Sequence, residues 1–155
     1  MIIAVREISL AVKDVQEAVR KFGALGFNPS PVWTDASPLI EASGASMQLP
    51  NTHLGVMASA GDDTPISRFV KKRGAGLFSI TLLVTRIEDV MAKWQGEGVE
   101  FVLERPLEFT NYLNVGRVVV PLLRVNWTRP STLCGLCIEL HEFRDADGNR
   151  FDPGD

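Results

Sequence analysis

The chain repeats one strand-and-helix pattern at a spacing of 72 residues, from position 7 to position 79. Glu7–Val12 and Ser79–Val84 both alternate apolar and polar residues, which predicts a strand in each. An amphipathic segment follows each strand and ends at a glycine, Gly26 in the first copy and Gly98 in the second. A strand, a helix and a terminating glycine that recur together indicate an internal duplication.

Further short strands are predicted after each helix. They cover 27–33, 44–50 and 52–59 in the first copy, and 99–104, 117–127 and 135–143 in the second. The stretch 106–115 has no counterpart in the first copy, so we expect an inserted loop there.

These elements predict an α+β fold in which paired βαβββ modules form a curved, half-open barrel-like sheet. Module one is expected at about 3–59, a linker helix at 64–74, module two at about 77–143 and a flexible acidic tail at 144–155. A chain of 155 residues with 45% hydrophobic residues suffices for one core, so a single domain over 1–155 is expected.

Composition narrows the range of partners. A net charge of -3 without a long lysine and arginine run argues against nucleic-acid binding. With neither a signal peptide nor an apolar stretch of membrane-spanning length, we expect a cytoplasmic protein without a membrane partner. Cys134 and Cys137 have redox-motif spacing, but residues three apart on a strand face opposite sides, which disfavours that role.

Three segments carry a family resemblance: EISLAVKD at 7–14, DTPISRFVKKRGAGL at 63–77 and NWTRPSTLCGLCIEL at 126–140. From about Ile3 to Phe143 the chain resembles the vicinal oxygen chelate (glyoxalase/bleomycin resistance/dioxygenase) superfamily, within it the methylmalonyl-CoA epimerase-like branch. The resemblance implies paired βαβββ modules, a small-molecule substrate and a homodimer.

The resemblance also implies a divalent metal held by a histidine in each first strand and a carboxylate or amide in each fourth strand. The matching positions are Glu7, Ser79, Gly55 and Glu139, and only Glu139 fits. Because such a site needs at least three good donors, we expect no metal and no other cofactor. A substitute divalent site through Glu7, Glu139 and His141 is the alternative.

Two carboxylates suggest chemistry that dispenses with the metal. If Glu7 and Glu139 face one partly buried cavity, repulsion and desolvation should raise at least one pKa and create an acid–base pair. His141 shares a strand face with Glu139, and His141, Ser79 or Arg124 would polarise the substrate oxygen. The alternative is a solvated glutamate and a hydrogen-bonded strand histidine.

The predicted catalytic residues are therefore Glu139, Glu7 and His141, and the predicted substrate-binding residues are Ser79, His53, Trp127, Arg124 and Phe78. Trp127 and Phe78 would form an apolar lining, and His53 shares a face with Gly55.

These residues favour an isomerase or lyase that acts on a small carbonyl compound or acyl-CoA by carboxylate general acid–base catalysis without the usual metal. A metal-free small-molecule binding or resistance protein is the first alternative, since loss of the metal ligands favours it. A metal-dependent epimerase is the second.

Overall fold

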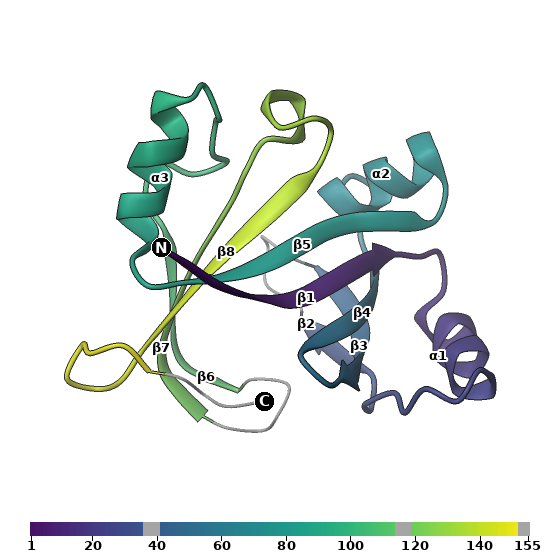
Figure 1. The fold of residues 1–155 in the computed structure, drawn as a ribbon. Helices are drawn as coiled ribbons and strands as arrows, with labels where there is room; N and C mark the ends of the chain where they lie inside the picture. Colours follow the sequence, from purple (N-terminus) through teal and green to yellow (C-terminus); the bar gives the residue numbers. More distant parts are fainter. Residues whose placement is uncertain (36–40, 114–118, 152–155) are drawn as a thin grey trace. The chain divides into compact units, whose positions relative to one another are not determined.

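A computed structural model describes residues 1–35, 41–113 and 119–151 of the chain (Figure 1). These residues fall into two compact units, one formed by residues 7–78 and the other by residues 1–6 with residues 79–155.

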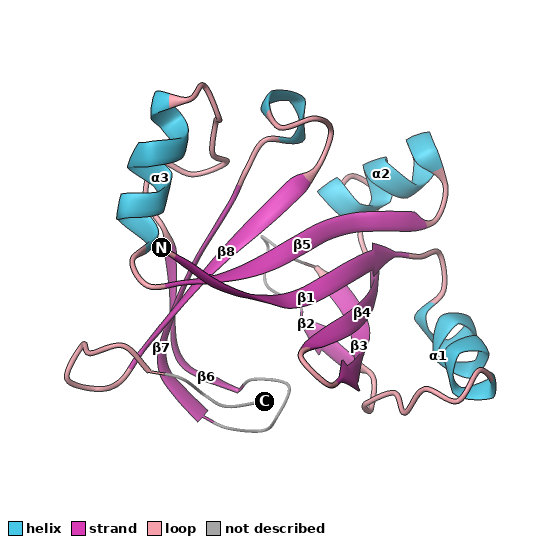
Figure 2. Ribbon diagram, in the orientation of Figure 1, coloured by secondary structure: helices cyan, strands magenta, loops and turns pink. Residues whose placement is uncertain are grey.

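Helices and strands follow one another as expected for a duplicated α+β fold (Figure 2). Their bounds are β1 (Ile2–Ala11), α1 (Val15–Ala24), β2 (Trp33–Asp35), β3 (Ala42–Leu49), β4 (Thr52–Ser59), α2 (Pro65–Arg73), β5 (Gly76–Val84), α3 (Ile87–Gly96), β6 (Leu107–Leu113), β7 (Val119–Trp127), a 3-10 turn (Pro130–Thr132) and β8 (Cys137–Arg144). The first module orders its strands β2-β3-β4-β1, and the second orders them β6-β7-β8-β5. The predicted pair of βαβββ modules is confirmed.

Strand register confirms the duplication residue by residue. In each module the first strand pairs in parallel with the fourth. Ser9 lies opposite Gly55 in the first module, and Thr81, which follows Ser9 by the same 72 positions, lies opposite Glu139 in the second. Sequence periodicity therefore located the first strand of both modules correctly.

The loop predicted at 106–115 is wrong for its described part, because β6 pairs there with β7 in antiparallel register. Its Leu107 and Phe109 pack against the module core, whereas Glu108 and Thr110 are exposed. The strand predicted at 99–104 is reduced to one isolated bridge from Phe101. The first module behaves likewise, with a single bridge from Pro29 before β2 begins.

The segment after β8 contains a defined turn where a flexible tail was expected. The Asp145 carboxylate accepts hydrogen bonds from the backbone N–H groups of Asp147 and Asn149, at 2.9 and 2.8 Å. Beyond the turn, the Phe151 N–H donates to the Phe143 carbonyl at 3.0 Å. Phe151 also packs against the core cluster that contains Phe143.

The sheet of the second module presents different chemistry on its two faces, because successive strand residues alternate. Ile138 and Leu140 of β8 pack against the Ile87 and Val90 side of α3. The opposite face carries a second apolar cluster, which includes Phe143. Glu139 and His141 of β8 belong to the second face and Glu142 to the first.

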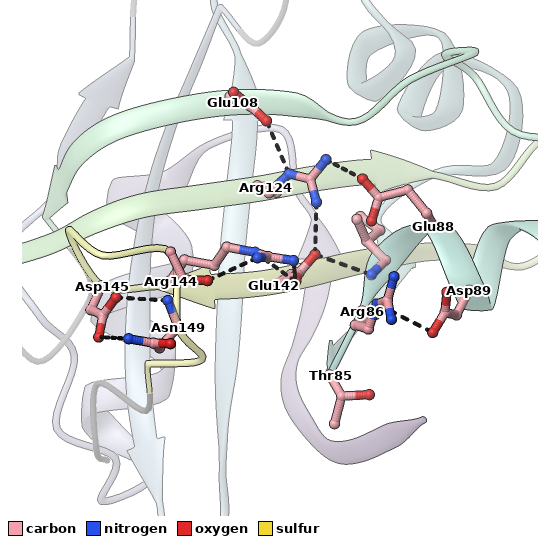
Figure 3. A network of polar contacts seen from close by, with 12 residues as sticks. Thr85, Arg86, Glu88, Asp89, Glu108, Arg124, Glu142, Arg144, Asp145 and Asn149 are labelled. Atoms are coloured by element: carbon pink, nitrogen blue, oxygen red, sulfur yellow. Dashed lines mark hydrogen bonds and ion pairs between the residues drawn. The ribbon is translucent and has the colours of Figure 1, made fainter.

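Glu142 connects the sheet to the start of α3. Its side chain is 1% exposed, yet it accepts hydrogen bonds from the Ile87 N–H at 3.1 Å, Arg124 Nη1 at 3.1 Å and Arg144 Nε at 2.9 Å (Figure 3). A buried carboxylate is tolerated when its charge is paired and its oxygens are hydrogen-bonded, as here.

Replacing Glu142 by Gln should lower the free energy of unfolding by about 3 kcal/mol, because its half-buried guanidinium partners lose the buried counter-charge. Urea denaturation at neutral pH measures the loss. Glu97→Gln, at an exposed position just after α3, is the matched control and should change stability little. Equal stabilities of the two variants would contradict a structural role for Glu142.

Candidate functional site

The second module holds a carboxylate on the face that points away from α3. Glu139 Oε1 lies 2.8 Å from His141 Nε2, and Glu139 Oε2 accepts from Thr81 Oγ1 at 3.4 Å. The side chain of Trp127, opposite Glu139 on β7, also hydrogen-bonds to it. Three strands thus supply the partners of one carboxylate. Glu139 and His141 share a face, as expected from their spacing, and Trp127 joins them from β7.

Burial by itself raises the pKa of the Glu139 carboxyl, whose side chain is only 19% exposed. The charge and hydrogen bond of His141 oppose burial, and hydrogen bonds from Trp127 and Thr81 add to them. Together they hold the pKa of Glu139 below its usual value, so the group is ionised at neutral pH. The predicted upward shift from like-charge repulsion is therefore wrong for Glu139.

His141 has one nitrogen that is paired and one that is not. Its Nε2 faces Glu139, whereas Nδ1 is buried and has no hydrogen-bond partner among the described residues. The ring packs edge-on against Phe143, with 5.8 Å between centroids.

Two small side chains, those of Ser79 and Cys137, lie on the same sheet face as the Glu139 carboxylate. Ser79 is 2% exposed and pairs with Cys137, which precedes Glu139 by two residues on the same face. Burial and the nearby Glu139 charge raise the pKa of Cys137 to about 12, so the group stays a thiol at neutral pH.

The first module holds its own carboxylate on β1. Glu7 Oε1 accepts from Ser9 Oγ at 2.8 Å, and Glu7 Oε2 accepts from Ser46 Oγ at 3.4 Å. A methyl group added at Gly55 would lie 2.4 Å from Glu7 Oε1, so the Glu7 side chain occupies the space that glycine leaves open. His53, which is 4% exposed, pairs with Glu7 in the β1–β4 register.

The two carboxylates are held by equivalent positions of the two modules. Ser9 and Thr81 hold the same place on the first strands. Ser46 lies opposite Gly55 on the third strand of module one, as Trp127 lies opposite Glu139 in module two. No chemical signal in the sequence marks these hydroxyl groups, apart from the repeat spacing that relates Ser9 to Thr81.

Two predicted substrate-binding residues lie elsewhere. Phe78 neighbours Ser79 in β5 and therefore faces the other way, where it packs edge-on against Phe69 with 5.4 Å between centroids. Arg124 pairs with Glu142 in the β7–β8 register, and so it lies on the sheet face opposite to Glu139. The prediction that Arg124 polarises a substrate oxygen beside Glu139 is therefore wrong.

The matched metal positions supply one carboxylate per module, accompanied by glycine in the first and serine in the second. Within either module this donor set does not fit a divalent cation, which needs at least three good ligands. Across the described residues, no group of three or more His, Cys, Asp and Glu side chains is arranged to hold a metal ion. None of the described helices is both long and apolar enough to cross a membrane.

Replacing His141 by Gln should raise the pKa of Glu139, because burial then outweighs the remaining hydrogen bonds. In the native protein the lowered pKa stabilises the fold above the unfolded-state pKa, and this stability is lost as pH falls through the folded-state pKa. The variant should lose this stability at a higher pH than the native protein does. Carbon-13 NMR titration of the glutamate carboxyls measures the shift.

Glu17 provides an internal control in the same titration, because its pKa is lowered by the hydrogen bond and charge of Lys21 on α1. The Glu17 titration should not move in the His141 variant. An unchanged Glu139 titration would show that His141 does not stabilise the ionised carboxylate.

Comparison with known proteins adds family and fold. A model of the Glyoxalase/Bleomycin resistance protein/Dioxygenase superfamily matches residues 6–111. No curated protein matches the chain. A hypothetical protein from Bacillus halodurans is 18% identical, with a TM-score of 0.73 over 91% of this chain and 94% of that one.

Two further solved structures are methylmalonyl-CoA epimerases. A variant of the Streptomyces coelicolor enzyme in complex with 2-nitronate-propionyl-CoA is 16% identical, with a TM-score of 0.74 over 91% of this chain and 97% of its own. The Mycobacterium tuberculosis enzyme is 20% identical, with a TM-score of 0.72 over 90% of this chain and 87% of its own. At these identities the likeness shows a shared fold.

Proposed function

Because the chain belongs to the glyoxalase/bleomycin resistance protein/dioxygenase superfamily, we propose that it is an isomerase or lyase acting on a small carbonyl compound or acyl-CoA. Catalysis is by carboxylate general acid–base chemistry without the usual metal. The observation that carries the proposal is the Glu139–His141 pair, a mostly buried carboxylate 2.8 Å from an imidazole on the sheet face that also carries the apolar cluster with Phe143.

Glu139 is the base in this mechanism. It is ionised at neutral pH and takes the proton from the carbon next to the substrate carbonyl, while the C–H electron pair moves toward the carbonyl oxygen and forms an enolate. The protonated Glu139 then returns the proton, or the enolate expels a leaving group. A carboxylate of lowered pKa is a weak base, so the substrate must carry an acidified proton such as that of a thioester or ketone.

His141 forms a dyad with Glu139 and is assigned the role of stabilising its ionised carboxylate. Ser79 and Trp127 border the same carboxylate and are assigned to substrate binding. In module one, Glu7 is the second candidate carboxylate, with His53 beside it. The acyl-CoA ligand named with the Streptomyces coelicolor epimerase supports an acyl-CoA as the substrate class.

One observation favours the alternative of a metal-free binding or resistance protein. The Glu139 side chain is only 19% exposed, and three side chains already hydrogen-bond to it. A carboxylate held in this way is suited to fixing one polar atom of a ligand within an apolar surface. A metal-dependent epimerase with Glu7, Glu139 and His141 as ligands is the second alternative.

A cytoplasmic homodimer is the assembly we propose in each case.

Replacing Glu139 by Gln should lower proton exchange by about 10²–10⁴-fold, because the amide keeps the shape but cannot accept the proton. Deuterium uptake from D2O at the α-carbon of methylmalonyl-CoA and of simple ketones, followed by mass spectrometry with chelator present, measures the exchange. Glu104→Gln, at an exposed position, is the matched control.

Uptake that survives the chelator and disappears in Glu139→Gln would support the proposal. Absence of uptake both with chelator and with added cobalt or manganese would overturn it for these substrates. Ligand binding by both the native protein and Glu139→Gln, with no turnover in either, would favour the binding protein. Uptake that requires added metal would favour the metal-dependent epimerase.

A further inference from the structure

A surface cavity lies on the α3 side of the sheet in module two, on the face opposite to Glu139. It has a volume of about 380 Å³ and is lined by Thr85, Arg86, Glu142, Arg144 and Arg150. Three arginines against one glutamate give this lining a positive formal charge, although the whole chain carries -3. A concentration of guanidinium groups in an acidic protein calls for a ligand-based explanation.

Glu142 offsets only part of this charge, because its one carboxylate pairs with Arg144 of the lining and also with Arg124. Arg124 contacts Oε2 at 3.1 Å, and Arg144 contacts Oε1 through Nη2 at 2.6 Å (Figure 3). Arg124, which does not line the cavity, also pairs with Glu88 and Glu108. Glu142 therefore acts as a rigid support that fixes the Arg144 guanidinium in the cavity wall.

The turn after β8 brings the third arginine to the cavity. Asp145 caps this turn through the N–H of Asn149, and Arg144 Nη1 donates to the Gly148 carbonyl at 2.8 Å. An isolated β-bridge then joins Arg150 to Arg144. A turn at the end of the chain's last strand thus places two arginines side by side.

Arg86 enters the cavity from the start of α3 and is loosely held. It forms an ion pair with Asp89, with Nε 3.4 Å from Oδ2, and its side chain is 67% exposed. Thr85 adds a hydroxyl group next to it in the lining. Guanidinium forks with a neighbouring hydroxyl match the oxygens of a phosphate group in geometry and charge.

We propose that this cavity is a binding site for a phosphate group, held by Arg86, Arg144 and Arg150. The site is separate from the Glu139–His141 dyad and does not depend on the function proposed for it. A free phosphate ion and a phosphate monoester offer the same terminal oxygens, so both are ligands of this chemistry.

Isothermal titration with inorganic phosphate, in a phosphate-free chloride buffer, tests the proposal on the full chain. Arg86→Gln and Arg150→Gln should each weaken phosphate binding about tenfold, because each removes a charged donor. Asp89→Asn should strengthen it, since Asp89 competes for Arg86. Arg20→Gln, an exposed arginine of α1, makes the same charge change and should have no effect.

Thermal melts of the variants establish that they remain folded, which is expected because Arg86 and Arg150 are exposed. The same titration with a phosphate monoester, such as glycerol phosphate, shows which form binds more tightly. Absence of binding of either probe at millimolar concentration would overturn the proposal. Equal weakening by Arg86→Gln and Arg20→Gln would also overturn it, because it would show attraction to net charge alone.

Discussion

Parallel pairing of the first and fourth strands is the constraint on which both modules depend. It fixes Glu7 beside His53 and Ser9 beside Gly55 in module one, and Thr81 beside Glu139 in module two. A slip of one residue would turn each of these side chains to the opposite face, so the register alone decides which groups meet. The hydrogen bond from Thr81 to Glu139 is a direct consequence of that register.

Strand alternation gives the two faces of the second module different carboxylate environments. Glu139 and Glu142 are three residues apart on β8 and therefore face opposite ways. Both are mostly buried carboxylates, but Glu142 is paired with two arginines and the start of α3, whereas Glu139 meets an imidazole, an indole and a hydroxyl. The first set neutralises charge and joins helix to sheet. The second leaves an ionised carboxylate that is hydrogen-bonded to His141, Trp127 and Thr81.

Periodicity predicted the module order and the first strands, because alternation and helical spacing are local properties of sequence. It placed Glu139 and His141 together, since residues two apart on a strand share a face, whereas Trp127 meets them through the β7–β8 register. It misplaced Arg124, because its face depends on the β7 register, and it missed β6, whose Leu107 and Phe109 alternate within a stretch that has no matching length in module one. The direction of the Glu139 pKa shift needed the partners supplied by β5 and β7, which no local pattern reveals.

The two modules carry their carboxylate on different strands, but equivalent positions of the two modules hydrogen-bond to it. In module one the acid comes from the first strand and lies over Gly55; in module two it comes from the fourth strand, and the first strand carries Ser79 at the position equivalent to Glu7. A second carboxylate in module one at Gly55 would overlap the Glu7 side chain and bring two like charges together. In module one, the small residue Gly55 on the fourth strand therefore follows from the acid Glu7 on the first strand. The same reasoning accounts for module two, where the small residue Ser79 is on the first strand and the acid Glu139 is on the fourth.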